Sequence, residues 1–481
     1  MADELSALDA TAQADLVRKH QASPAELVDH AIAAIERVNP QINAVIIPLF
    51  EKARAQAQGR SLPDGPFRGV PILLKDLICG TQGDPLYNGM RLLKEMAFVA
   101  SHDSYLATKF RAAGFICIGR TNTPELGLNG TTEPEAFGPT RNPWDLQRSS
   151  GGSSGGSAAA VTARMVSVGH GGDGGGSIRV PASECGLVGL KPSRGYVSWG
   201  PELGDCWHGF ATQGVMTRSV RDTAGVLDAI AGNMPGDPYA APARARPFLQ
   251  EVSASPGALR IGLIKQRPVS STSLHPDCVE AVEHTARLLE SLGHHVEESY
   301  PAALDDAGLI EHVTTIVASD TAATLVQMGT SLGRKVTPKD VEPATWQIAT
   351  TGFALSAEQY LNAVSWVHSW SRRMASWWDS GFDLLLTPTI AEPPVLLGTF
   401  TGTPEDALSG FRRALQMACF TPAYNATGQP AISLPLHWNG AGLPIGIQLV
   451  AAFGRDDLLI RIAGQLEQAQ PWAQRRPPIC A

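Results

Sequence analysis

Two clusters of glycine and serine lie close together in this chain, "GGSSGGS" at residues 151–157 and "GGDGGGS" at residues 171–177. Glycine loses more backbone freedom on folding than any other residue, so a folded protein seldom concentrates it without a reason. The apolar segments "AAAV" and "MVSV" between the clusters predict a helix that runs into a strand. Flexible linkers rarely contain such elements. The clusters therefore indicate a structured site rather than a linker.

The composition favours a large globular protein. The chain has 481 residues, of which 43% are hydrophobic and 17% are charged, which is enough for a large buried core. The net charge is −8, and no stretch concentrates Lys or Arg as nucleic-acid-binding proteins do, so we expect no nucleic-acid partner. No apolar run reaches the ~18 residues of a membrane span, and the N-terminus lacks the apolar segment of a signal peptide. We expect no membrane partner.

The cysteines argue against a metal site. The seven cysteines are widely spaced and match no CxxC or Cys/His zinc pattern. An odd number without a disulfide pattern is typical of a reducing compartment. We therefore expect a cytoplasmic protein without a metal ion.

Helix and strand patterns alternate along most of the chain, which indicates an α/β fold. Residues 23–40, "SPAELVDHAIAAIERVNP", predict a helix that is capped by Ser23 and Glu26 and ends before Pro40. The segment "GVPILLKDL" predicts a buried strand whose apolar run ends, unusually, in Lys75.

The glycine clusters also match the dinucleotide-binding pattern G-x-G-x-x-G through Gly169, Gly171 and Gly174. In that motif a helix should follow the glycines, but here Pro181 interrupts it. This context argues against a dinucleotide cofactor.

An α/β-hydrolase is another possibility. Residues 151–155, "GGSSG", fit the G-x-S-x-G motif, with Ser153 as the nucleophile of an esterase. Asp383 and His437 follow in the chain order of that fold, but neither lies in a recognisable signature. His170 is better explained as a packed or hydrogen-bonding side chain, because triad partners normally converge from separate loops.

The lysine at the end of the apolar strand offers a different base. Serine is a weak nucleophile until a base removes its proton, and lysine can be that base when burial lowers its pKa. Together, this lysine and the two clusters resemble the amidase signature family. The matching stretches run from about residue 65 to the C-terminus and are "GVPILLKDL", "TNTPELG", "TRNPWD", "GGSSGGSAAAV", "GGDGGGSIRVPASECGLVGLKPSRG", "GVMTRSVRD", "DLLLTPT" and "NATGQPAISLP".

The resemblance implies a Ser-cisSer-Lys catalytic triad. Ser177 would be the nucleophile, Ser153, preceded by a cis peptide bond, would relay the proton, and Lys75 would be the base. An oxyanion hole would come from the backbone N–H groups of Gly174, Gly175, Gly176 and Ser177.

Further residues would support this triad. Gly152 would tolerate the cis bond, Ser154 would form a hydrogen bond within the first cluster, and Asp173 and Arg179 would hold the nucleophile loop. Gly174 stands where the family usually has a side chain, which would give the loop extra freedom.

The resemblance also implies a substrate pocket that includes Leu128 and Asn129. Leu128 stands where one similar member of the family has a polar Asn, so we expect apolar or aromatic acyl groups. The five tryptophans at 346, 366, 370, 377 and 378 could wall this pocket, although we expect at least three of them to pack a helix on the sheet.

The implied fold is a single amidase signature domain over residues 1–481, with helices covering a central mixed, twisted β-sheet on both faces. The expected segments are an N-terminal helical segment (1–64), the catalytic core (65–230), a variable surface and helical segment (231–340), and the C-terminal part of the core with the pocket wall (341–481).

The implied function is hydrolysis of a C–N bond in a small-molecule amide or carbamate through a serine acyl-enzyme. Water would be the second substrate, no cofactor would be needed, and the chain would form a homodimer. One competing function is that of an A-type subunit of glutamyl-tRNA amidotransferase, although "WQIATTGFALS" lacks the basic residues that we associate with its glutamine pocket. The esterase that uses Ser153 and a binding protein on an inactive scaffold also remain possible.

Overall fold

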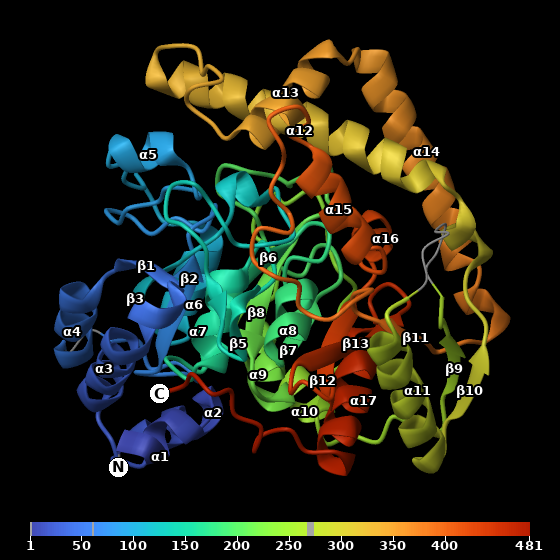
Figure 1. Cartoon of the computed structure of the whole chain (residues 1–481). Coiled ribbons are helices and arrows are strands. Elements are labelled where there is room, and N and C mark those ends of the chain that lie inside the picture. Colours follow the sequence, from blue (N-terminus) through green and yellow to red (C-terminus); the bar gives the residue numbers. More distant parts are fainter. Residues whose placement is uncertain (1, 60–61, 267–273) are drawn as a thin grey trace.

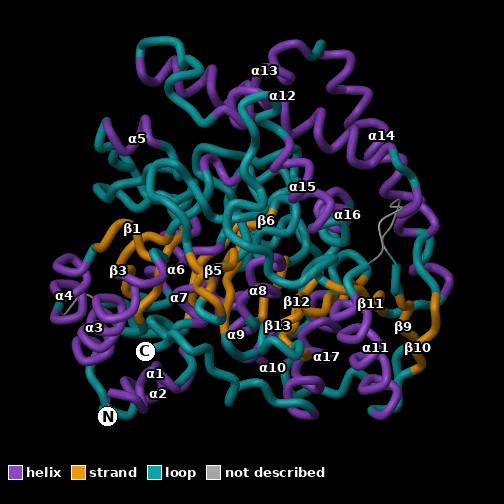
Figure 2. The backbone as a smooth tube through the Cα atoms, viewed as in Figure 1, coloured by secondary structure: helices purple, strands orange, loops and turns teal. Residues whose placement is uncertain are grey.

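The computed structural model describes residues 2–59, 62–266 and 274–481. Residues 1, 60–61 and 267–273, which belong to the expected segments 1–64 and 231–340, lie outside the described residues. Figure 1 shows a central β-sheet surrounded by helices, and in Figure 2 the strands form one band through the lower half of the molecule. The predicted α/β class with a mixed sheet is confirmed.

The main sheet has 11 strands in the order β1-β3-β2-β6-β8-β7-β12-β13-β11-β9-β10. Their bounds are β1 (Val45–Pro48), β2 (Pro71–Lys75), β3 (Ile116–Thr121), β6 (Val168–Asp173), β7 (Val188–Lys191), β8 (Thr212–Thr217), β9 (Arg260–Leu263), β10 (His295–Glu298), β11 (Leu384–Pro388), β12 (Ala431–Trp438) and β13 (Pro444–Ala451). A separate antiparallel pair consists of β4 (Arg141–Asn142) and β5 (Asp145–Ser149).

The helices account for most of the remaining regular structure. The α-helices are α1 (Ala2–Ala7), α2 (Ala10–Arg18), α3 (Pro24–Ile42), α4 (Phe50–Gln58), α5 (Arg91–Glu95), α6 (Tyr105–Ala112), α7 (Gly155–Thr162), α8 (Arg179–Cys185), α9 (Val220–Ile230), α10 (Phe248–Glu251), α11 (Pro276–Ser291), α12 (Gly308–Leu332), α13 (Pro343–Ala354), α14 (Ala357–Ala375), α15 (Ser409–Met417), α16 (Pro422–Ala426) and α17 (Asp456–Ala469). The 3₁₀ helices are η1 (Glu125–Gly127), η2 (Ala302–Asp305) and η3 (Trp378–Ser380).

Both faces of the sheet are covered, as strand β2 shows. Side chains alternate between the two faces of a strand. Leu73 packs in a core that includes α3 and α7, whereas Ile72 and Leu74 pack in the larger core with α6, α9 and α17. A strand that is buried on both faces reads as an unbroken apolar run, and this run is "PILL" in β2.

Strands β2 and β6 position the candidate site. They are parallel neighbours, with Ile72 opposite Val168 and Leu73 opposite Gly169. Parallel strands have their carboxyl ends at the same edge of a sheet. The Lys75 end of β2 and the Asp173 end of β6 therefore meet at one edge, which lies below the layer of α12, α13 and α14 in Figure 1.

The predicted N-terminal helix is confirmed, but its end is different. Ser23 and Glu26 form a reciprocal capping box, and the helix continues past Pro40 to Ile42. The prediction that it ends before Pro40 was wrong, because a proline in the last turn removes only one helical hydrogen bond.

Candidate active site

Lys75 and Ser153 are in direct contact at the sheet edge. Lys75 is the last residue of β2, and only 1% of it is exposed. Its Nζ donates to Ser153 Oγ over 2.6 Å. The peptide bond between Gly152 and Ser153 is cis, as the family resemblance implies.

The environment of Lys75 favours the neutral amine. Burial lowers the pKa of Lys75 to about 7, although the negative charge of Asp173 opposes this shift. A lysine in water has a pKa of about 10.4, so almost none of it is neutral near pH 7. In this site a substantial fraction of Lys75 can accept a proton at neutral pH.

Ser177 lies on the loop between β6 and α8, and it is half-buried. It lines two adjoining cavities of about 100 and 290 Å³. Gly127 also lines both cavities, and a Cβ atom added to it would lie 3.2 Å from Ser153 Oγ. The structure thus brings Lys75, Ser153 and Ser177 to the same edge of the sheet.

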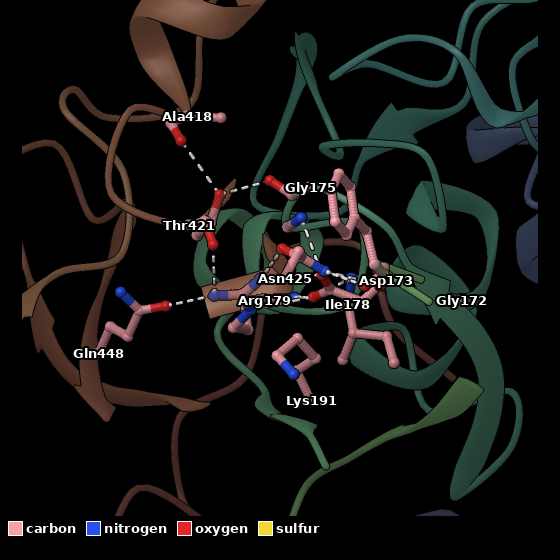
Figure 3. Close-up of polar contacts among 12 residues, drawn as sticks. Gly172, Asp173, Gly175, Ile178, Arg179, Lys191, Ala418, Thr421, Asn425 and Gln448 are labelled. Atoms are coloured by element: carbon pink, nitrogen blue, oxygen red, sulfur yellow. Dashed lines mark hydrogen bonds and ion pairs between the residues drawn. The ribbon is translucent and has the colours of Figure 1, made fainter. Parts of the chain in front are cut away.

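A buried ion pair holds the loop that carries Ser177, between β6 and α8, which we name the nucleophile loop after the predicted role of Ser177 (Figure 3). The side chains of Asp173 and Arg179 are fully buried, and Arg179 donates to both carboxylate oxygens, over 2.8 and 3.0 Å. The carboxylate also accepts from the backbone N–H groups of Gly176 and Ile178. Burial alone would raise the pKa of Asp173, but the charge and hydrogen bonds of Arg179 hold it well below its usual range. Asp173 and Arg179 therefore contact the loop itself.

The remaining donors of Arg179 reach the C-terminal part of the chain. They bind the backbone carbonyl of Thr421 and the side-chain oxygens of Asn425 and Gln448, over 2.6–3.1 Å. Figure 3 shows these partners converging on the guanidinium from the side of the molecule coloured brown. The Thr421 hydroxyl also donates to the carbonyl of Gly175, over 2.6 Å. A buried guanidinium with all its donors engaged gives the loop a fixed conformation.

The hydrogen bonds of the loop change one prediction about the oxyanion hole. The N–H of Gly176 donates to Asp173 Oδ1 over 2.8 Å. Gly176 therefore does not supply the predicted oxyanion donor, because its N–H already satisfies the buried carboxylate. The candidate donors become the N–H groups of Gly174, Gly175 and Ser177. Gly176 is required for its conformation, with φ +129°, and its missing Cβ would lie 2.4 Å from Thr421 Oγ1.

Gly174 is explained by a tryptophan. A Cβ atom at Gly174 would lie 2.6 and 2.7 Å from two ring atoms of Trp207. The indole therefore occupies the space that a side chain at position 174 would need. The expectation of extra loop freedom at Gly174 was wrong, because Trp207 packs on the loop from this side.

Gly152 and Ser154 connect the first cluster to its surroundings. A Cβ at Gly152 would lie 2.5 Å from the backbone nitrogen of Thr131, so only glycine fits there. Ser154 Oγ donates to the carbonyl of Gly172 at the end of β6, over 3.3 Å. This bond joins the two Gly/Ser clusters.

Leu128 and Asn129 both line the cavity space. Leu128 borders both cavities and is only 8% exposed, in a cluster with Val317 and Ile348. Asn129 borders the smaller cavity, and its Oδ1 accepts from the N–H of Gly130 over 2.7 Å. An apolar side chain therefore stands where the family resemblance implies a polar one.

The histidines and aspartate of the esterase interpretation are not assembled around a serine. His170 Nδ1 accepts from the N–H of Lys75, and its other ring nitrogen contacts Gln213. Burial lowers the pKa of His170 to about 3, so it is a neutral, packed residue. Asp383 accepts from the N–H of Arg260, and the ring of His437 lies beside that of His284. Neither Asp383 nor His437 is among the described residues that border the cavities with Ser177.

The tryptophans of the C-terminal part are packing residues. All five at 346, 366, 370, 377 and 378 lie in or against the hydrophobic clusters, and none is among the described residues that line the two cavities. The cavities are instead bordered by Trp207 and, in the larger one, Trp199. No motif in the sequence indicated these two residues.

Two further properties concern metals and membranes. In the described ranges, no group of three or more His, Cys, Asp or Glu side chains is arranged to hold a metal ion. No helix within these ranges is long and apolar enough to cross a bilayer.

Comparison with known proteins decides the family. A family model described as Amidase matches residues 26–460. The chain belongs to the amidase signature family. Its relatives include the 6-aminohexanoate-cyclic-dimer hydrolase of Paenarthrobacter ureafaciens, which is 45% identical and aligns over 98% of this chain and 96% of the relative.

Solved structures of amidase signature enzymes agree with this assignment. A 6-aminohexanoate cyclic dimer hydrolase in complex with its substrate is similar, with a TM-score of 0.95 and 44% identity over 99% of this chain and all of that chain. A bacterial aryl acylamidase of the amidase signature family follows, with a TM-score of 0.88 and 29% identity over 97% of both chains. The protein is an amidase, a hydrolase of amide C–N bonds.

Proposed function

We propose that this amidase cleaves small-molecule amides or carbamates through a covalent acyl-enzyme on Ser177, with Lys75 as the base and Ser153 as the proton relay. The observation that carries the proposal is the 2.6 Å contact between Lys75 Nζ and Ser153 Oγ in a buried environment. When Lys75 is neutral, the same contact allows the Ser153 hydroxyl to donate to the amine.

The first half of the reaction forms the acyl-enzyme. Ser177 Oγ attacks the carbonyl carbon, its proton passes to Ser153 Oγ, and the proton of Ser153 passes to Lys75 Nζ. The carbonyl electrons move to oxygen, and the resulting anion is stabilised by backbone N–H groups of the nucleophile loop. The C–N bond then breaks, and the proton on Lys75 returns through Ser153 to the leaving nitrogen.

The second half releases the acid. A water molecule attacks the ester carbon and gives one proton to the same relay, and the C–O bond to Ser177 breaks as Ser177 recovers its proton. The burial of the relay favours proton transfer between its members over exchange with solvent.

The substrate class follows from the walls of the smaller cavity. Leu128 and the apolar side chains of α12 and α15 form most of this surface. We therefore expect apolar or aromatic acyl amides, carbamates, or short nylon-type oligomers to bind. The cyclic 6-aminohexanoate dimer, which appears in the name of the relative from Paenarthrobacter ureafaciens, belongs to this class of substrates.

The test is covalent labelling. A serine-directed phosphonyl fluoride should modify Ser177, and peptide mapping identifies the labelled residue. Ser177→Ala should lose both labelling and amide turnover while its circular dichroism spectrum stays unchanged. A label on Ser153 would support an esterase that uses this serine, and no label would support a binding protein. Release of ammonia from glutamine as the preferred reaction would support an amidotransferase subunit.

A further inference from the structure

Two largely apolar cavities meet at Ser177, and the larger one also contains the carboxylates of Asp205 and Asp320. The smaller, which we name the apolar lobe, and the larger, which we name the polar lobe, have volumes of about 100 and 290 Å³. They share five lining residues, which are Gly127, Leu128, Gly174, Ser177 and Trp207. A carbonyl carbon attacked by Ser177 therefore lies where the lobes join, and its two substituents can enter different lobes.

The apolar lobe is bordered by two helices. Val313 and Val317 come from α12, and Phe411, Ala414 and Leu415 come from α15. Removal of an apolar group from water into such a surface is favourable by about 25 cal/mol per Å². This lobe fits an alkyl or aryl group.

The polar lobe contains two carboxylates that lack a cation. Asp205 and Asp320 border it, together with Asn88 and Gln327. Asp205 accepts from the hydroxyl of Tyr239 over 3.3 Å. Neither carboxylate forms an ion pair with any residue that the structure describes. The lobe therefore presents acceptor oxygens and negative charge to a ligand.

Burial lowers the pKa of Arg194 and the charge of Asp205 opposes this shift, but the two side chains form no ion pair in the part of the chain that the structure describes. Arg194 donates to the backbone carbonyls of Asn425 and Ala426, over 2.9–3.0 Å. Burial raises the pKa of Asp320, and the charge of Asp205 contributes in the same direction, while a hydrogen bond to the backbone of Trp207 opposes the shift. A cationic or donor-rich group in the lobe would relieve this repulsion.

Trp207 stands between the two lobes. Its ring packs at the Cα of Gly174 on the nucleophile loop, and its backbone forms a hydrogen bond to Asp320 on α12. Both Trp207 and His208 have φ of +53°, which is an uncommon conformation for a residue with a side chain. The turn therefore holds the indole in one place, against both the loop and the helix.

We propose that Trp207 divides the substrate cavity, so that the enzyme selects amides with an apolar group on one side of the scissile bond and a primary amine or similar N–H donor on the other. This inference rests on the proposed function of Ser177. It adds that one side of the amide is recognised by apolar contacts alone and the other also by the carboxylates of Asp205 and Asp320.

Four amides with the same carbon skeleton test the inference. They are N-hexylhexanamide, N-(6-aminohexyl)hexanamide, 6-amino-N-hexylhexanamide and 6-amino-N-(6-aminohexyl)hexanamide. One of the two amides with a single amine should exceed both the amine-free and the diamine compound in kcat/KM by about tenfold, the effect of one charge-assisted hydrogen bond. The better one identifies the lobe that receives the acyl side.

Variants assign this preference to residues. Asp320→Asn should lower kcat/KM for the preferred amide about tenfold, mainly through KM, and change kcat/KM for N-hexylhexanamide by a smaller factor. Trp207→Ala should join the lobes and bring the four kcat/KM values close together, whereas Trp207→Phe should keep their order. Trp438→Phe is the matched control, because Trp438 lies on β12 away from both cavities and its buried Nε1 has no hydrogen-bond partner among the described residues.

The outcomes separate the inference from the proposed function. Equal kcat/KM for all four amides, or an unchanged order in Trp207→Ala, overturns the division of the cavity. Phosphonylation of Ser177 without cleavage of any of the four overturns it as well. Failure to phosphonylate Ser177 overturns the proposed function instead.

Discussion

Two buried lysines at strand ends can be compared directly in this enzyme. Lys75 ends β2 and Lys191 ends β7, each after an apolar run and each only 1% exposed. Burial lowers the pKa of both to about 7. They differ in what the amine contacts, which is the hydroxyl of Ser153 for Lys75 and the carbonyl of Pro192 for Lys191.

The comparison shows that a lowered pKa does not by itself make a catalytic base. A carbonyl oxygen cannot pass on a proton, whereas a serine hydroxyl can both donate and accept one. Lys75 is connected to the cavity through such a hydroxyl. Lys191 lies near the Asp173–Arg179 pair, below it in the view of Figure 3. Its position indicates that Lys191 has a structural role.

Replacing Lys75 should have the largest effect on activity. Lys75→Ala should reduce kcat/KM for an amide by about 10³–10⁴-fold, because general acid–base catalysis contributes up to this amount. Lys75→Arg should not restore activity, since arginine stays charged. An activated ester should lose less, because its leaving group needs little proton transfer. Steady-state kinetics with the amide and the ester measures these losses. Near-normal amide hydrolysis by Lys75→Ala would exclude Lys75 as the base.

Replacing Asp173, the carboxylate near both lysines, should have the next largest effect, which is on stability. Asp173 opposes the lowered pKa of Lys75 and of Lys191, and it pairs with Arg179. Asp173→Asn should cost about 3–5 kcal/mol of unfolding free energy, because it leaves a buried guanidinium without its partner. Denaturant unfolding measures this change. A destabilisation below about 1 kcal/mol would show that other groups hold the loop.

The pH dependence of activity tests the assignment of Lys75 as the base. Because Lys75 must be neutral to accept a proton, kcat/KM should rise with pH and level off above about pH 7, the pKa of Lys75. Below this value the rate should fall about tenfold per pH unit, as the charged fraction grows. A rate profile on a neutral amide measures the limb. If the midpoint lay near the free-lysine value, the proposed desolvation of Lys75 would be wrong.

Lys191 should give the smallest effect. Lys191→Met keeps most of the side-chain volume and removes the bond to the carbonyl of Pro192 together with the charge beside Asp173. We expect kcat/KM within about tenfold of wild type and the same pH limb, since changes outside the reacting groups usually cost little. Loss of the limb in Lys191→Met would show that this lysine, too, takes part in proton transfer.

The local parts of the site could be predicted from sequence. The apolar run that ends in Lys75 and the motifs around Ser153 and Ser177 are contiguous, and the resemblance of these motifs to the amidase signature family implied the cis bond and the roles of the two serines. The α/β class and the capped helix α3 follow from periodicity and caps.

The long-range parts could not be predicted. Arg179 binds Thr421, Asn425 and Gln448, which are more than 240 positions away in the chain, and no local pattern indicates that contact. Trp207 borders the cavities through a turn of unusual φ, whereas the tryptophans clustered in sequence pack on helices. The assignment of Gly176 to the oxyanion hole failed because it required knowing that its N–H faces the carboxylate of Asp173.

The contacts of Arg179 also affect when the enzyme becomes active during its synthesis. The ribosome adds Thr421 242 residues after Arg179, and it adds Gln448 269 residues after Arg179. A nascent chain that already contains both serines and the lysine still lacks the partners that complete the guanidinium's hydrogen bonds. We therefore expect hydrolytic activity to appear only after the C-terminal strands have been synthesised.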